Sequence, residues 1–233
     1  MKLLLRGLLG GSVQLALFAA LILVPAGLLP GGTWSWERGQ LYIVGYGLAM
    51  FTAVTTLALF APRSLEARLN RPPRTDQPPA DRVITALIIS TSLAWFVFIP
   101  IDVFYLKLIS APPLGISAAG GVLALAGYVF VIVTIYQNAY AIPVVADQTD
   151  PGQSLVDTGL DSVVRHPLYL GILPFFAGSA LWLGSYAGVI AGGAILLTLL
   201  ARIVVEERTL MDTLPGYPEY TRRVRYRLVP FVW

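Results

Sequence analysis

The amino-acid sequence predicts an all-α integral membrane protein with about six transmembrane helices. Hydrophobic residues make up 56% of the 233 residues, and the mean hydropathy is +0.72. Only 12% of the residues are charged, compared with about 25% in a typical soluble domain. The apolar residues also form long uncharged blocks, each able to cross a hydrocarbon core about 30 Å thick. A chain of this length has too few charged residues to form a surface that faces water on all sides.

The composition excludes several classes of function. The net charge is +3, and the arginines lie between apolar blocks. Arginines placed in this way set the topology of a membrane protein and contact membrane lipids, so no nucleic-acid partner is predicted. The chain has no cysteine, which excludes disulfides, thiolate catalysis and Cys-ligated zinc. Because His166 is the one histidine, no metal site is predicted.

Four uncharged blocks in the front half each predict one membrane-spanning helix. The predicted helices cover residues 13–29, 41–60, 83–101 and 116–136. A signal peptide is the alternative for the first block, although no small-x-small cleavage pattern follows it. Residues 63–82 predict a loop, because they hold five arginines and two Pro-Pro pairs. Gly120, Gly121 and Gly127 would allow another helix to pack closely on the fourth span.

The last uncharged block, residues 167–201, predicts a helical hairpin. As one helix it would be about 52 Å long, which exceeds a single crossing, and Leu183-Gly184-Ser185 divides it near the middle. Six spans place both termini on one side of the membrane. The positive-inside rule makes that side cytoplasmic, because all basic residues except Arg38 and Lys107 would lie there.

This hairpin brings polar residues from its two ends to one end of the bundle. His166 and Tyr169 lie at the start of the fifth span, where Pro167 suits the first turn of a helix. Arg202 and Glu206 lie at the end of the sixth span, four residues apart and so on one helix face. These four residues either line a functional pocket or are ordinary anchors at the membrane interface, with Arg202 and Glu206 forming an ion pair that stabilises their helix.

Two sequence elements at this hairpin resemble those of a known enzyme family. The run Val-Arg-His-Pro-Leu-Tyr-Leu-Gly at 164–171 is followed by Arg-Ile-Val-Val-Glu-Glu at 202–207, and then by Tyr217, Tyr220, Val224 and Pro230. This pattern, which covers roughly residues 136–233, resembles the isoprenylcysteine carboxyl methyltransferase family, and phospholipid N-methyltransferases share much of it. The resemblance divides the chain into N-terminal transmembrane helices, 1–136, and a methyltransferase core, 137–233.

The resemblance implies a membrane enzyme that uses S-adenosyl-L-methionine and releases S-adenosyl-L-homocysteine. The cofactor would enter from the cytoplasm, and a lipophilic or prenylated small substrate would enter from the bilayer. The implied catalytic residues are Arg202, which would also face the substrate, and Glu206. The implied cofactor-binding residues are Gln153, Ser154, Leu155, Val156, His166, Pro167, Leu168, Tyr169 and Glu206.

Two positions depart from the family pattern. Gln153 replaces a histidine common in the eukaryotic members, and Asp161 replaces the tyrosine of a Gly-x-Tyr element. Asp161 is therefore not counted among the expected site residues.

Arg202 bears on the methyl acceptor. A carboxylate is already ionised near neutral pH and needs only a cation to orient it. An amine must first lose a proton to His166 or a glutamate, and an arginine could equally hold a phospholipid phosphate. We therefore expect carboxyl methylation, with a phospholipid amine or a small thiol as alternative acceptors and a non-catalytic membrane protein as the alternative from another class. The sequence predicts no oligomeric state.

Overall fold

The fold is that of a computed structural model, which describes residues 1–70, 79–140 and 155–233, with residues 79 and 80 described by their backbone alone. Within these ranges every regular element is a helix and there is no strand. The α-helices are α1 (Lys2–Leu28), α2 (Glu37–Phe60), α3 (Pro62–Leu69), α4 (Pro79–Ile101), α5 (Leu114–Gln137), α6 (Pro167–Leu183), α7 (Tyr186–Thr213) and α8 (Tyr217–Arg223). A π-helical turn, η1 (Asp102–Leu106), extends α4, and a 3-10 turn, η2 (Gly159–Ser162), precedes α6.

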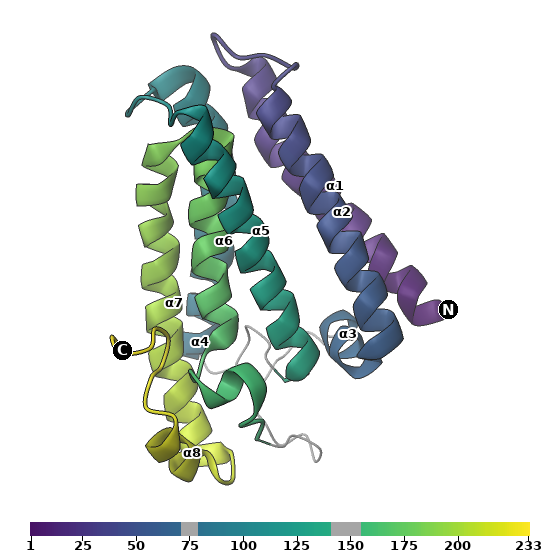
Figure 1. Cartoon of the computed structure of the whole chain (residues 1–233), viewed down its shortest axis with the longest axis vertical. Coiled ribbons are helices and arrows are strands. Elements are labelled where there is room, and N and C mark those ends of the chain that lie inside the picture. Colours follow the sequence, from purple (N-terminus) through teal and green to yellow (C-terminus); the bar gives the residue numbers. More distant parts are fainter. Residues whose placement is uncertain (71–78, 141–154) are drawn as a thin grey trace.

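Five of these helices are long and apolar enough to cross a membrane: α1, α2, α4 with its η1 extension, α5 and α7. Helix α6 is also apolar but shorter, with 17 residues, and it runs beside α5 and α7 in the bundle (Figure 1). The protein is therefore an all-α, multi-pass membrane protein. The predicted spans fall on these helices, although the first helix begins at Lys2 and not near Val13.

The helices form two groups. Helices α4, α5, α6 and α7 pack as a bundle, while α1 and α2 form a hairpin that leans away from α5 (Figure 1). Helix α1 connects the groups because it packs on both α2 and α4, and α7 lies against both α4 and α6. The starts of α4 and α6 and the end of α7 therefore meet at the lower end of the view, where α8 also lies.

The loop predicted over residues 63–82 is wrong in part. Residues 62–69 form α3, which begins with a proline in its first turn and buries Leu65 against α1 and α2. Helix α4 already begins at Pro79, so Asp81 is helical. Pro79, which was misread as a helix breaker, stands at the start of α4, where its missing N–H is not needed. Residues 71–78 of the predicted loop lie outside the described residues.

The predicted division of the last apolar block is confirmed, and local signals explain it. Gly184 ends α6 with φ +97°, a left-handed conformation that glycine adopts without strain. The Ser185 hydroxyl then caps α7 by accepting a hydrogen bond of 2.7 Å from the Gly188 N–H. The same hydroxyl donates to Asp102 at 2.6 Å. Asp102 is thus buried against the α6–α7 turn.

Glycines allow α5 and α6 to pack with their backbones in contact, as the sequence predicted for Gly120 and Gly127. A Cβ added to Gly127 would lie 2.5 Å from the Phe175 nitrogen, and one added to Gly178 would lie 2.4 Å from the Ala124 nitrogen and the Gly120 oxygen. Close contact of this kind is how membrane helices associate without a hydrophobic driving force between them.

Replacing Gly178 with alanine is therefore expected to destabilise the bundle by roughly 1–3 kcal/mol, because the new methyl group meets backbone that cannot yield. The unfolding midpoint in detergent micelles measures this effect. Gly193→Ala on α7 is the matched control, since a Cβ there meets nothing within 4 Å and alanine favours the helix. Equal midpoints for the two variants would contradict close packing at Gly178.

Candidate functional site

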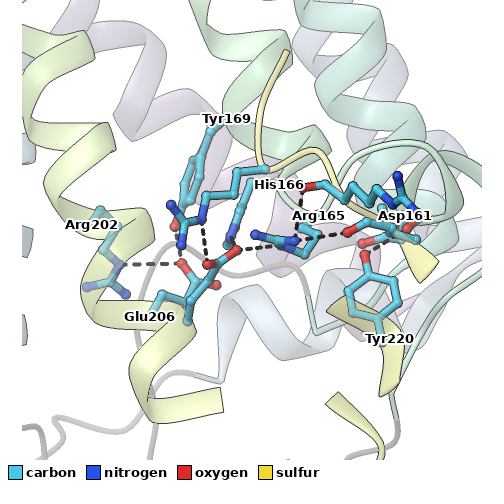
Figure 2. A network of polar contacts seen from close by, with 11 residues as sticks. Asp161, Arg165, His166, Tyr169, Arg202, Glu206 and Tyr220 are labelled. Carbon is cyan, nitrogen blue, oxygen red and sulfur yellow. Dashed lines mark hydrogen bonds and ion pairs between the residues drawn. The ribbon is translucent and has the colours of Figure 1, made fainter. Parts of the chain in front are cut away.

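The polar residues of the predicted hairpin gather at the end of the bundle where α6 begins and α7 ends. Figure 2 shows Arg202, Glu206, Tyr169 and His166 close together, with Arg165 leading from them toward Asp161 and Tyr220. The network has two parts, because the adjacent residues Glu206 and Glu207 point about 100° apart on their helix and bind different partners.

The start of α6 is fixed by hydrogen bonds to the C-terminal segment, residues 224–233, which follows α8. His166 is the last non-helical residue, with φ −126° and ψ 61°, which lies outside the α region that a following proline disfavours. Its backbone N–H donates to the Arg227 carbonyl at 2.9 Å, and the Arg165 N–H donates to the Tyr226 carbonyl at 2.9 Å. The Arg165 guanidinium also donates to the Val224 carbonyl at 2.9 Å. The C-terminal segment therefore pairs with the residues that lead into α6.

Glu207 joins these segments through its side chain. Its Oε1 accepts a hydrogen bond of 2.6 Å from Arg165 Nε, and its Oε2 accepts one of 2.7 Å from Arg227 Nε. His166 Nε2 lies 3.3 Å from the same Oε1, and the Arg227 guanidinium lies 5.0 Å from the centre of the Trp233 ring. The Glu207 side chain is only 9% exposed, and a buried carboxylate is stable only with such partners. Glu207 thus holds α6, α7 and the C-terminal segment together.

Glu206 occupies the other part of the network. Its Oε2 accepts a hydrogen bond of 2.8 Å from the Tyr169 hydroxyl and lies 3.8 Å from Arg202 Nε. The side chain is 20% exposed, so it is reachable from outside, unlike that of Glu207. The Tyr169 ring stacks on the His166 ring, with 5.6 Å between ring centres. This arrangement gives a partly exposed carboxylate beside a flat aromatic wall.

Arg202 is completely buried and forms an ion pair that the sequence analysis missed. Its Nη1 bonds to Oδ1 of Asp81, which is also completely buried, and donates to the Thr85 hydroxyl at 3.2 Å. Arg202 Nε and Nη2 and Asp81 Oδ2 have no hydrogen-bond partner within the described part of the chain. The available signal was an acidic residue two residues before the predicted span 83–101, because an acid buried at a membrane helix needs a cation.

Four of the remaining predicted cofactor residues, Leu155, Val156, Pro167 and Leu168, belong to the described part of the chain. Pro167 and Leu168 are buried at the start of α6, and Leu168 belongs to the main apolar core. Leu155 packs on a separate apolar cluster at the end of α7 and in α8 that includes Tyr217. Val156 is half-buried. Gln153 and Ser154 lie outside the described residues.

Asp161 has a structural environment of its own. Its Oδ1 accepts a hydrogen bond of 3.1 Å from Asn138, its backbone carbonyl accepts one of 2.7 Å from the Tyr220 hydroxyl, and the residue is 5% exposed. Burial raises the pKa of the Asp161 carboxyl to about 6, although the Asn138 hydrogen bond lowers it in part. Asp161 thus connects the end of α5 to α8.

Asp161→Asn is expected to raise the unfolding midpoint at pH 7.5 and to have a smaller effect near pH 4. The pKa of Asp161 is higher in the folded state than in the unfolded chain, so the folded state binds this proton more tightly. The free energy of unfolding therefore falls as pH rises from about 4 to 6, and stays lower above that range. Asp157→Asn is the control, because the Asp157 carboxyl is more exposed and pairs with Arg223. Equal destabilisation by Asp161→Asn at both pH values would contradict this account.

An apolar groove lies between α6, α7 and the C-terminal segment. It has a volume of about 520 Å³ and is lined by Leu173, Leu196, Leu200, Ala201, Val204, Leu228, Val229, Val232 and Trp233. Leu173 lies one turn after Tyr169 on α6, so the groove begins close to the polar network. Its lining comes from α6, α7 and the C-terminal segment.

Comparison with known proteins gives one family match. Residues 116–215 match the family model described as phospholipid methyltransferase, and no curated protein sequence matches the chain. The matched region runs from the start of α5 to just beyond α7, so it contains His166, Tyr169, Arg202 and Glu206, while Asp81 lies before it. Over α5, α6 and α7, the chain is similar to the phospholipid methyltransferase family, which supports a methyltransferase in a membrane.

Proposed function

We propose that this protein is an integral-membrane methyltransferase that uses S-adenosyl-L-methionine and acts on a lipophilic substrate. The observation that carries the proposal is the set of Glu206, Tyr169 and Arg202, in which a partly exposed carboxylate is held by a tyrosine and an arginine. This set lies within the region that matches the phospholipid methyltransferase family.

The residues at the site fit the cofactor. Glu206 can accept hydrogen bonds from the amino group or the ribose hydroxyls, and a partly desolvated carboxylate makes such contacts strong. The buried Tyr217 hydroxyl has no hydrogen-bond partner within the described part of the chain, which leaves it free to bond to the cofactor. The stacked rings of His166 and Tyr169 offer a flat wall suited to adenine. When bound, the cofactor supplies an activated methyl group.

The role of the protein in such a transfer is mainly to position the acceptor. Methyl transfer is an in-line displacement, so holding the acceptor atom opposite the leaving sulfur accounts for much of the catalysis. We propose that the apolar part of the substrate lies in the groove beside Leu173. The polar end would then approach Glu206 and Arg202, on the side of the membrane that we propose is cytoplasmic because the basic residues gather there.

Among the acceptors, we favour a phospholipid amine. Arg202 lies between the carboxylates of Asp81 and Glu206, so its positive charge is already compensated by two acidic partners. Such a site attracts an ammonium group more than a carboxylate. Glu206, the partly exposed member, is placed to accept the proton that an ammonium must lose before it attacks. The family match points the same way, which reverses the order expected from the sequence.

Carboxyl methylation of an isoprenylcysteine-like substrate is the second candidate. The supporting observation is that Arg202 Nε and Nη2 have no hydrogen-bond partner within the described residues. Two adjacent N–H donors of an arginine match the two oxygens of a carboxylate.

An acceptor panel separates these candidates. The purified protein in vesicles is supplied with S-adenosyl-L-methionine labelled in its methyl group, together with a phosphatidylethanolamine, a prenylcysteine analogue or a lipophilic thiol. We expect label in the phospholipid amine. Label in the prenylcysteine analogue alone would establish the second candidate. Absence of label in every lipid-soluble acceptor, from protein that binds the cofactor product, would contradict a lipophilic substrate.

A further inference from the structure

The ion pair between Asp81 and Arg202 joins a residue outside the region that matches the family to a residue inside it. Asp81 lies in the first turns of α4, before the matched residues 116–215, and Arg202 lies in α7 within them. Both side chains are completely buried. Removing a charge from water costs several kcal/mol unless a partner of opposite charge compensates it. Each residue therefore compensates the buried charge of the other.

The contacts of Arg202 divide its guanidinium group into two edges. Nη1 is occupied by Asp81 Oδ1 and the Thr85 hydroxyl, both of which belong to α4. Nε lies 3.8 Å from Glu206 Oε2, and Nη2 has no hydrogen-bond partner within the described part of the chain. Because the guanidinium is planar and its donors are rigidly arranged, fixing Nη1 also fixes the direction of Nε and Nη2.

We propose that Asp81 is a positioning residue for the methyl-transfer site, which it serves by holding Arg202 so that the Nε and Nη2 edge faces Glu206 and the acceptor. This inference rests on the proposed function. It assigns to α4 a part in the site although α4 lies outside the region similar to methyltransferases. A long side chain such as arginine has many rotamers, and Asp81 together with Thr85 selects one of them.

If the role of Asp81 were purely structural, a different result would be expected. If the Asp81–Arg202 pair only fastened α4 to α7, loss of Asp81 would lower stability and leave the turnover of the folded protein unchanged. Asp102 provides the comparison, because it is another buried acid that binds Ser185 and the Leu108 N–H at the opposite end of the bundle. Asp102→Asn should therefore lower the unfolding midpoint without changing kcat or KM.

The experiment compares wild type, Asp81→Asn, Asp81→Glu and Asp102→Asn. For each protein it measures the unfolding midpoint, the Kd of S-adenosylhomocysteine by calorimetry, and kcat and KM for the acceptor that the panel identifies. For Asp81→Asn we expect kcat to fall roughly 10- to 100-fold, because a displaced catalytic group has effects of this size. KM for the acceptor should rise and the Kd for S-adenosylhomocysteine should change little. Asp81→Glu, which restores the charge, should recover much of the lost turnover.

The outcomes separate the inference from the function on which it rests. Wild-type kcat and KM in Asp81→Asn, or a loss of stability alone as in Asp102→Asn, would overturn the inference while the function stands. A wild type that neither binds S-adenosylhomocysteine nor transfers methyl groups would overturn both. If Asp81→Asn does not fold, Thr85→Val removes the second contact to Nη1 and should lower kcat with little change in stability. Unchanged kcat in that variant would also overturn the inference.

Discussion

Replacing Glu206 with alanine is expected to weaken binding of S-adenosylhomocysteine roughly 10- to 150-fold while the protein remains folded. The Glu206 side chain is partly exposed, and its Oε2 contacts both the Tyr169 hydroxyl and Arg202 Nε. Because Arg202 keeps its ion pair with Asp81, removing Glu206 leaves no buried charge without a partner. The cofactor would lose its carboxylate partner, and a hydrogen bond to a charged group contributes about 1.5–3 kcal/mol. Calorimetry on detergent-purified wild type and variant measures the loss of binding directly.

Glu219→Ala is the control for this experiment, because Glu219 is an exposed glutamate on α8. It should bind S-adenosylhomocysteine as the wild type does. Glu206→Gln should bind weakly, because it keeps the shape of the side chain and loses its charge. Wild-type affinity in Glu206→Ala would remove Glu206 from the cofactor site and with it the main support for the site assignment.

Replacing the next residue, Glu207, with alanine is expected to have the opposite pattern, with a large loss of stability. This carboxylate binds Arg165, Arg227 and His166. Without it, the buried Arg165 side chain loses its only anionic partner in the described part of the chain, and breaking such a buried pair costs about 3–5 kcal/mol. The contacts between the start of α6 and the C-terminal segment should then be lost, and the protein should unfold more readily.

Unfolding in detergent, followed by circular dichroism, measures this second effect. Because Glu206 and Glu207 are neighbours of identical chemistry, each alanine variant is the matched control for the other. We expect Glu207→Ala to unfold well below the wild type and Glu206→Ala to unfold close to it. Similar midpoints for both variants would mean that Glu207 does not hold the segments together.

The sequence predicted the features of the fold that depend on local chemistry. The α6–α7 hairpin follows from Gly184 and Ser185, which end one helix and cap the next. Convergence of His166, Tyr169, Arg202 and Glu206 follows from the hairpin, because the two helix ends must then lie side by side. The glycines of α5 indicated close packing because a small residue is what allows helix backbones to approach.

The features that the sequence did not reveal depend on contacts between distant residues. The partner of Arg202 is Asp81, which lies 121 residues away in sequence, and no local pattern identifies which acid reaches which cation. The different roles of Glu206 and Glu207 depend on which neighbour each helix face meets. Helix α3 was missed because its two arginines and the Pro-Pro pairs that follow it favour a loop, whereas the burial of Leu65 that stabilises it comes from α1 and α2.

The most direct test of the proposed function is calorimetric binding of S-adenosylhomocysteine to the wild-type protein in detergent. We predict saturable binding in the micromolar range, with one molecule bound per chain. A well-folded wild type that shows no binding heat and no shift of its unfolding midpoint with added S-adenosylhomocysteine would contradict the methyltransferase assignment. It would mean that the similarity over residues 116–215 reflects the helical framework alone.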